Sequence, residues 1–303
     1  MQRIAELLSA AMGNDRILLQ ESMKKHTTFR IGGPADVFAV PQTIDEAAEI
    51  VRVCREHGTP FYVIGNGSNL LVSDSGYRGV VLQIFKNLSE IIIDEENVTV
   101  QAGAMLSVIA KKALACGLTG FEFASGIPGT MGGAAVMNAG AYGGEMKDVL
   151  TEVTVLTADG SIETVPAEEL QLGYRHSIIP EKNWIVLGAK LKLSKGDPEQ
   201  VAARMEELKV QRVSKQPLDL PSAGSTFKRP PGAFAGKLIM DAGLRGFSIG
   251  DAQVSEKHCG FVVNKGNATA ENVCDLIAEV TERVREYSGI TLEPEVKMLG
   301  EFS

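Results

Sequence analysis

A glycine loop follows directly after a segment that predicts a buried strand. The strand pattern covers 61–64, and the chain then continues as Gly65-Asn66-Gly67-Ser68-Asn69. Glycine permits a positive φ and lets backbone N–H groups approach an anion without a Cβ in the way. A pyrophosphate is a ligand that suits such a loop, although Gly-x-Gly alone is more common in ordinary β-turns. A Rossmann fingerprint is disfavoured, because no third glycine follows and 70–72 predicts a strand instead of a helix.

A second stretch, 125–145, is far richer in glycine. Seven glycines fall between positions 126 and 144, where the overall composition would place about two. Neutral side chains that can hydrogen-bond a ligand lie among them, so we predict a binding loop, with a tightly packed connection as the alternative. Its candidate ligand-binding residues are Ser125, Gly126, Gly129, Thr130, Gly132, Gly133, Asn138 and Gly140. Two such loops, about sixty residues apart, suit one long dinucleotide lying across both.

Composition and charge bound the kind of protein. The 303 residues are 44% hydrophobic and 22% charged, which is enough for a substantial core in two domains, or in one large domain with a smaller one attached. The net charge of −8 argues against nucleic acid as a partner, because binding phosphate backbones needs a concentrated basic face. A small anionic ligand, which needs only a few cations, is still compatible with this charge.

Targeting and metal signals are missing from the sequence. Residues 1–16 form a short amphipathic stretch with acidic residues, unlike a signal peptide, and no apolar run reaches the roughly 18 residues of a membrane span. The four cysteines are scattered without metal-ligand spacing. We therefore expect a cytoplasmic protein with reduced thiols, no membrane contact and no metal. The oligomeric state is left open, a monomer included.

The periodicity predicts alternating helices and strands, hence an α+β protein. Helices are expected at 43–58 (with Thr43 and Glu46 as a capping box), 106–116, 198–212, 236–242 and 270–287. Strands are expected at 61–64, 80–84, 91–100 and 260–264, with several short ones over 149–192. The proline-containing segment 215–224 is typical of a domain boundary. We predict a ligand domain at 1–200, with lobes at about 1–85 and 86–200, and a second domain at 201–303 whose last few residues return to the first lobe.

Eight segments, in order along nearly the whole chain, resemble the UDP-N-acetylenolpyruvoylglucosamine reductase (MurB) family. They are HTTFRIGGPAD (26–36), GNGSNLLV (65–72), GIPGTMGGAAVMNAGAYGGE (126–145), YRHS (174–177), SAGSTFKRP (222–230), KLIMDAGLRG (237–246), VSEKHCGFVVN (254–264) and LEPEV (292–296). The resemblance implies an FAD-binding domain of the vanillyl-alcohol oxidase and p-cresol methylhydroxylase type, made of two α+β subdomains, plus a C-terminal α+β substrate-binding domain. Some relatives of that fold attach FAD to a His in the first glycine loop. This chain has none there, so non-covalent FAD is implied.

The family's reaction implies the chemistry that the site must perform. NADPH reduces FAD, and hydride from flavin N5 then adds to the methylene carbon of UDP-N-acetylglucosamine enolpyruvate, giving UDP-N-acetylmuramate for peptidoglycan. Because a carboxylate is a poor electron sink, the site needs a cation at that carboxylate and a proton for the α-carbon.

The resemblance assigns three catalytic residues. Arg175 matches the arginine that stabilises the enolate, and its planar fork suits a carboxylate. Ser225 matches the proton donor to the α-carbon. Glu295 matches the carboxyl group that assists the enolate, and it can donate a hydrogen bond only when it is protonated. Taken singly, the three residues are more typical of a surface ion pair, a turn and a solvated strand end.

The resemblance suggests several residues that bind the substrate, without a single assignment for each. Lys215 matches a lysine that binds the substrate diphosphate, while Lys228, Arg212 and Arg229 are further cationic candidates. Tyr174 is a candidate for the site wall, with a packed aromatic as the alternative. The short spacing from Arg175 to Ser225 resembles the family's shorter type, which lacks an added tyrosine-bearing loop, so the residue that covers the uridine stays open.

Two rival functions remain at the level of sequence. Another FAD-dependent oxidoreductase of the same fold would explain the glycine loops, but not the joint presence of YRHS, GSTFK and LEPEV. A non-catalytic module that binds a nucleotide sugar or flavin predicts the loss of a reacting residue, and all three are present.

We predict ping-pong kinetics, with NADPH and the sugar nucleotide competing for one site. The sequence carries no second dinucleotide fingerprint, so NADPH should occupy the cleft that the sugar nucleotide leaves. Initial velocities measured over a grid of both substrates should give parallel double-reciprocal lines. Intersecting lines would count against a shared site.

Overall fold

The chain divides into two compact units, each assembled from three separate stretches of sequence. Unit 1 comprises Met1–Leu18, Val37–Asn66 and Val80–Arg212, and unit 2 comprises Leu19–Asp36, Gly67–Gly79 and Val213–Ser303. The computed structural model describes residues 1–302. Each unit has its own hydrophobic core. The boundary thus cuts the first glycine loop between Asn66 and Gly67, which no pattern in the sequence indicates.

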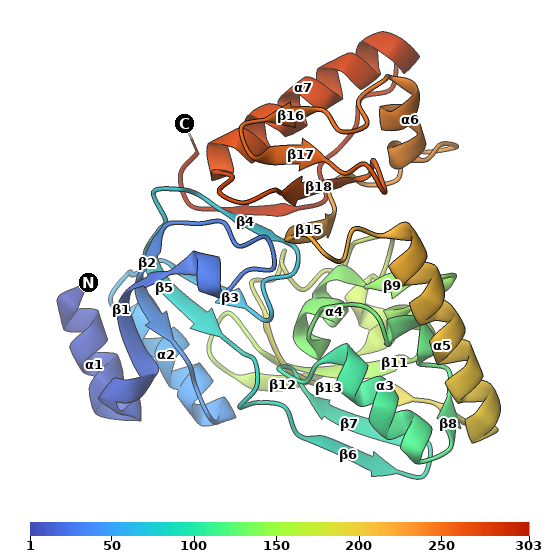
Figure 1. Cartoon of the computed structure of the whole chain (residues 1–303). Coiled ribbons are helices and arrows are strands. Elements are labelled where there is room, and N and C mark those ends of the chain that lie inside the picture. Colours follow the sequence, from blue (N-terminus) through green and yellow to red (C-terminus); the bar gives the residue numbers. More distant parts are fainter. Residues whose placement is uncertain (303) are drawn as a thin grey trace. The chain divides into compact units, whose positions relative to one another are not determined.

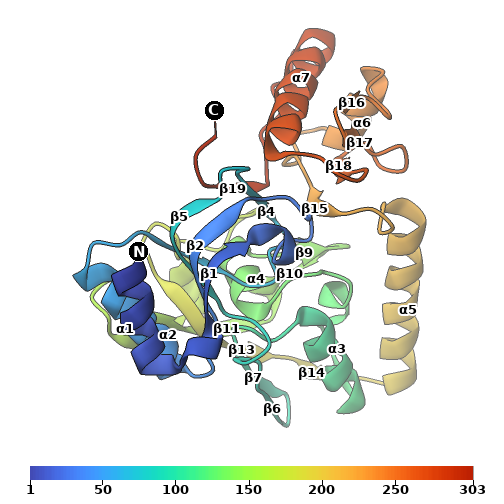
Figure 2. The ribbon, with the colours of Figure 1, turned by 60° about the vertical axis from the view of Figure 1, so that its left-hand side comes forward.

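The N-terminal part of the chain combines two helices with a sheet of order β1-β2-β5-β3. Helices α1 (Gln2–Met12) and α2 (Ile44–Glu56) lie side by side in both views (Figures 1 and 2) and bury apolar residues in the same core. The strands are β1 (Ile17–Ser22), β2 (Pro34–Ala39), β3 (Phe61–Ile64) and β5 (Tyr77–Gln83). The expected helix and its Thr43 cap are confirmed, since Thr43 Oγ1 accepts from the Glu46 N–H at 3.2 Å. The capping box is wrong in one half, because the Glu46 carboxylate accepts from Gln42 N–H at 2.7 Å.

Unit 1 also contains a five-stranded antiparallel sheet of order β12-β11-β13-β7-β6. Its strands are β6 (Ile91–Asp94), β7 (Asn97–Gln101), β11 (Leu150–Leu156), β12 (Ile162–Pro166) and β13 (Ile185–Lys192). The expected helix at 106–116 is α3 (Leu106–Ala115), and the expected helix at 198–212 is the longer α5 (Pro198–Lys215). Unit 1 also contains the two-residue strands β8 (Leu118–Thr119), β9 (Gly140–Ala141), β10 (Gly144–Glu145) and β14 (Ser194–Lys195).

The second glycine stretch contains a helix, where the sequence predicts only a loop. Helix α4 (Met131–Met137) packs on β13. Its alanines favour helix, and a Cβ at Gly132 would lie 3.0 Å from the Cβ of Ala102, so glycine permits this close packing. Tertiary packing therefore overrides the glycine content here.

Unit 2 has an antiparallel sheet of order β15-β18-β17-β16 beside two helices. The strands are β15 (Ser222–Ser225), β16 (Ser248–Ile249), β17 (Ala252–Val254) and β18 (Phe261–Asn264), and the helices are α6 (Ala235–Asp241) and α7 (Ala270–Ser288). The apolar stripe predicted for the last helix is buried in α7. Near the C-terminus, β19 (Lys297–Leu299) pairs in parallel with β4 (Leu70–Val72), which follows the first glycine loop.

The N-terminus of α7 is capped twice. Thr269 and Asn272 form a reciprocal capping box. The Asp74 carboxylate accepts from the N–H groups of Ala270 at 3.0 Å and Glu271 at 3.1 Å. A negative charge at this end also interacts favourably with the helix dipole.

Asp74→Ala should therefore lower the free energy of unfolding by about 1–2 kcal/mol, because two N–H groups lose their acceptor and the helix dipole loses its counter-charge. Denaturant unfolding followed by circular dichroism would measure this change. Asp94→Ala, at an exposed strand end, is the matched control. Equal stability of the two variants would show that the Asp74 cap contributes nothing.

Candidate active site

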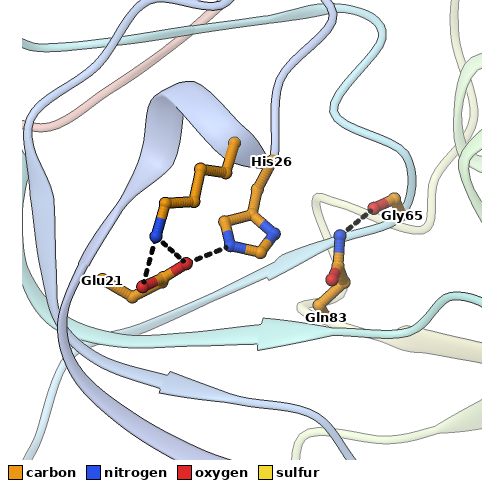
Figure 3. A network of polar contacts seen from close by, with 5 residues as sticks. Glu21, His26, Gly65 and Gln83 are labelled. Carbon is orange, nitrogen blue, oxygen red and sulfur yellow. Dashed lines mark hydrogen bonds and ion pairs between the residues drawn. The ribbon is translucent and has the colours of Figure 1, made fainter.

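The beginning of the first glycine loop lies against the second loop within unit 1. The Asn66 side chain donates to the carbonyl of Pro128 at 2.7 Å. A Cβ added to Gly65 would lie 2.2 Å from Thr130 Oγ1, so only glycine allows this approach. The Gly65 carbonyl accepts from Gln83 Nε2 at 3.1 Å, as Figure 3 shows. The two loops predicted to share one dinucleotide are thus in contact.

Backbone hydrogen bonds hold the second loop in place up to the start of α4. Gly129 O accepts from Leu106 N–H at 3.1 Å, and the N–H of Gly132 donates to Ala102 O at 2.8 Å. Thr130, which is buried, is the N-cap residue of α4. At Gly133, by contrast, a Cβ would meet only Thr130 Oγ1, at 3.7 Å, so there is room for another group beside this backbone.

Two of the predicted ligand-binding side chains bond to the protein itself. Asn138 is fully buried; its Nδ2 donates to Glu145 Oε2 at 2.8 Å and to Gly173 O at 2.9 Å, and its Oδ1 accepts from Lys147 N–H at 2.9 Å. Ser125 Oγ donates to Glu122 O at 2.7 Å. Both side chains therefore order the loop, and Asn138 also fixes the segment that leads to Arg175.

Arg175 lies at the tip of a tight turn. Gly173 and His176 exchange two backbone hydrogen bonds, of 3.1 and 3.2 Å, around Tyr174 and Arg175. Arg175 has φ 54°, a conformation that is strained for a residue with a side chain and is often kept at functional sites. Its Nη2 donates to Gly140 O at 3.3 Å, and its guanidinium lies 5.2 Å from the ring centre of the exposed Tyr174. The turn thus brings the predicted enolate-stabilising arginine to the second glycine loop.

Arg212 is a second cation beside this loop, and the sequence ranked it among the weaker candidates. Its Cδ would lie 3.0 Å from a Cβ at Gly126, so the side chain covers the loop's first glycine. Burial lowers the pKa of the Arg212 guanidinium, and the nearby Tyr142 works in the opposite direction. An arginine stays charged under such a shift, so the positive charge is retained next to the loop.

In unit 2, the rest of the first glycine loop packs on residues 26–28. Gly67 has φ 61°, and a Cβ there would lie 2.1 Å from the carbonyl oxygen of His26. The Glu21 carboxylate contacts the His26 ring at 3.0 Å, and the same carboxylate forms an ion pair with Lys25 (Figure 3). Ser68 lies with Asn69 in the turn that follows Gly67 and is half-buried. The motif at 26–36 therefore supports the glycine loop, a role that no spacing in the sequence reveals.

Ser225 ends a bulged strand and is exposed. In the pairing of β15 with β18, Ser222 faces Val263 and Ser225 faces Phe261, so β15 contains one extra residue. Gly224 has φ 79°, a conformation that glycine adopts without strain. Bulges of this kind redirect the side chain that follows them, which explains why a glycine precedes Ser225.

Glu295 lies beside Ser225 in the same unit. Its N–H donates to Thr226 O at 2.8 Å, and Lys228 N–H donates to Glu293 O at 2.8 Å, so the two segments run antiparallel. The Glu295 carbonyl accepts from Asn69 Nδ2 at 3.4 Å. Ser225, Glu295 and the end of the first glycine loop are therefore brought together within unit 2.

The lysine side chains predicted to bind the substrate differ in their surroundings. Lys228 forms an ion pair with Glu293, which already offsets its charge. Lys215 is the exposed last residue of α5. The following residue, Gln216, has a buried Oε1 that lacks a hydrogen-bond partner among residues 1–302, and a buried acceptor of this kind is what a bound donor would satisfy.

Metal groups and membrane helices are absent from residues 1–302. No three His, Cys, Asp or Glu side chains are grouped there to hold a metal, and no helix is long and apolar enough to span a bilayer.

Comparison with known proteins identifies the family. Residues 35–166 match a family described as FAD binding domain, and residues 216–299 match the C-terminal domain of UDP-N-acetylenolpyruvoylglucosamine reductase. The UDP-N-acetylenolpyruvoylglucosamine reductase of Agathobacter rectalis is 58% identical over 298 residues, covering 94% of this chain and 95% of that relative. This chain belongs to the UDP-N-acetylenolpyruvoylglucosamine reductase family. The enzyme of that name from Caldanaerobacter subterraneus subsp. tengcongensis is 52% identical and covers 98% of each chain.

Solved structures agree with this membership. The crystal structure of the UDP-N-acetylenolpyruvylglucosamine reductase from Thermus caldophilus superposes with a TM-score of 0.79 at 37% identity, covering 94% of this chain and 98% of that one. A structure of alkyldihydroxyacetonephosphate synthase gives a TM-score of 0.50 at 16% identity over 64% of this chain and 41% of that one, which shows a shared fold alone. The expected fold, with an FAD-binding domain of the vanillyl-alcohol oxidase type, is confirmed.

The loops of this reductase fit FAD, its cofactor. The backbone beside Gly133 is open, which leaves room for the FAD pyrophosphate to approach it without a Cβ in the way.

Gly133→Ala should separate folding from cofactor binding. The added methyl group has room within the protein and raises helix propensity, so the stability of the apoprotein should be retained or should rise by about 0.5–1 kcal/mol. A pyrophosphate against this backbone would be displaced, raising the Kd for FAD at least about tenfold. Flavin fluorescence titration would measure this Kd, with Gly266→Ala, outside both loops, as the control. Unchanged FAD affinity would exclude Gly133 from the cofactor site.

Proposed function

We propose that this chain reduces the enolpyruvyl ether of UDP-N-acetylglucosamine to the lactyl ether of UDP-N-acetylmuramate, a step of peptidoglycan precursor synthesis, with NADPH as the reductant. The observation that carries the proposal is the pairing of Thr226 with Glu295, which places Ser225 and Glu295 side by side next to Asn69. FAD held by the glycine loops would supply the hydride for the enolpyruvyl methylene carbon. Side chains of the protein would have to meet the two remaining requirements, a positive charge at the substrate carboxylate and a proton for the α-carbon.

Arg175 is proposed to bind the substrate carboxylate. As hydride arrives at the methylene carbon, negative charge develops on the carboxylate, which already carries a full charge. A guanidinium can offer two parallel N–H donors to both oxygens, which an ammonium group cannot do. The turn that strains Arg175 and its bond to Gly140 support this assignment, because they fix the direction of the side chain before the substrate binds.

Ser225 is proposed to protonate the α-carbon, and Glu295 to stabilise the enolate. Ser225 is exposed at the end of its strand, where a ligand can reach its hydroxyl group. A serine is a weak acid, so its proton is released only towards a strongly basic carbanion such as the enolate. Glu295 can donate a hydrogen bond to the enolate only in its protonated form, which a dry site beside the substrate's charge would favour.

The substrate's diphosphate is proposed to bind at Lys215, with Arg212 as a second cation in preference to Lys228. Lys215 is exposed and Lys228 is already paired with Glu293, which supports this order. We further propose that the enzyme works in the cytoplasm, where its NADPH and nucleotide-sugar substrates would be available.

Ser225→Ala should affect only one of the two half-reactions, the one in which the enolpyruvyl substrate is reduced. NADPH should still bleach the bound flavin at the normal rate, because Ser225 takes no part in that step. Turnover of the enolpyruvyl substrate should fall by about 10²–10⁴-fold, the range for loss of a positioned proton donor. Stopped-flow absorbance would follow each half separately. Ser248→Ala, an exposed strand serine of the same unit, is the matched control. Wild-type turnover by the Ser225 variant would refute the assignment.

A further inference from the structure

Thr28 makes two hydrogen bonds that join separate parts of the site within unit 2. Its N–H donates to the carbonyl of Gly67 at 3.2 Å, in the first glycine loop. Its hydroxyl donates to the carbonyl of Ser222 at 2.6 Å, at the start of β15. Gly67 and Ser222 are far apart in the sequence, so one threonine links the glycine loop to the strand that carries Ser225.

The segment around Thr28 is itself firmly held. Phe29 and Ile31 are buried in the core of unit 2, together with Ala223 of the bulged strand. The Phe29 carbonyl accepts from Asn264 Nδ2 at 3.2 Å, and Asn264 lies on β18, the neighbour of β15. Thr28 therefore presents its hydroxyl from a fixed backbone, and it can restrain the strand instead of moving with it.

The hydrogen bond from the Thr28 hydroxyl reaches β15 at the start of its bulge. The strand is irregular between Ser222 and Ser225, and an extra residue locally disrupts the ladder of hydrogen bonds. Gly224 has no side chain to pack, and a Cβ added there would meet nothing within 4 Å. The Thr28 hydroxyl fixes Ser222, the first residue of the bulge, and the pairing of Thr226 with Glu295 fixes the residue after it, so the unpacked Gly224 is held from both sides.

We propose that Thr28 is a positioning residue for proton delivery by Ser225. It holds the start of the bulge in register with the first glycine loop, so that the Ser225 hydroxyl keeps one direction relative to that loop. The inference rests on the proposed role of Ser225. Without the Thr28 hydroxyl, the bulge should sample other arrangements and the serine should be aligned for only part of the time.

Thr28→Val removes the hydroxyl at nearly constant shape, while the backbone N–H to Gly67 remains. Reduction of the flavin by NADPH should be unchanged, and the oxidative half-reaction with the enolpyruvyl substrate should slow by about 10- to 100-fold, as for a reacting group displaced by about 1 Å. In the apoprotein, hydrogen exchange of the amides at 223–226 should become faster. Thr28→Ser, which keeps the hydroxyl, should restore both properties, and Thr28→Ala provides a second variant without it.

Thr281→Val is the matched control. Thr281 is a half-buried threonine whose hydroxyl also donates to a backbone carbonyl, that of Ile277 at 2.7 Å, but within α7. This variant should alter neither half-reaction nor exchange at 223–226. The positioning role is overturned if the Thr28 variants behave like Thr281→Val, or if they slow both half-reactions equally. If Ser225→Ala itself turns over normally, the proposed role of Ser225 fails instead, whatever the Thr28 variants show, and the proposed reduction of the enolpyruvyl substrate stands.

Discussion

Two backbone hydrogen bonds hold together the segments that carry Ser225 and Glu295, the residues proposed to protonate and stabilise the enolate. The N–H of Glu295 bonds to Thr226 O, and the N–H of Lys228 bonds to Glu293 O, so the C-terminal segment runs beside the strand of Ser225. Main-chain pairing of this kind does not depend on the identity of the side chains, because only backbone N–H and C=O groups take part. The parallel pairing of β19 with β4 then continues the same segment along the first glycine loop.

Glycine serves two different purposes in the site. At Gly65 and Gly67, a side chain would collide with the neighbouring backbone or with Thr130, so glycine allows two segments of the protein to touch. At Gly133 and Gly224, a side chain would meet little or nothing, so glycine there leaves a backbone exposed or a strand bulged. Both uses lower local stability, and capped and well-packed elements such as α7 offset that cost elsewhere in the chain.

Much of the fold could be predicted from the sequence, because long periodic segments carry their own signal. The apolar stripe of α7 and the Thr43 cap of α2 are examples. Helix α4 was missed, because its glycines lower helix propensity and its packing against residue 102 cannot be seen in a local pattern. The division of the first glycine loop between the two units was missed for a similar reason, since it depends on contacts between residues far apart in the sequence.

The sequence proposes residues for the candidate site, but it does not reveal how those residues are connected. The ordered motifs singled out Arg175, Ser225 and Glu295, whereas the strained turn, the bulge and the Thr28 bonds appear only with the backbone in place. A crystal structure of the complex with FAD and the enolpyruvyl sugar nucleotide tests the central claim most directly. The FAD pyrophosphate should lie on both glycine loops, with the substrate carboxylate on Arg175 and its α-carbon about 3–3.5 Å from Ser225 Oγ. A pyrophosphate bound elsewhere, or an α-carbon out of reach of Ser225, would contradict the account.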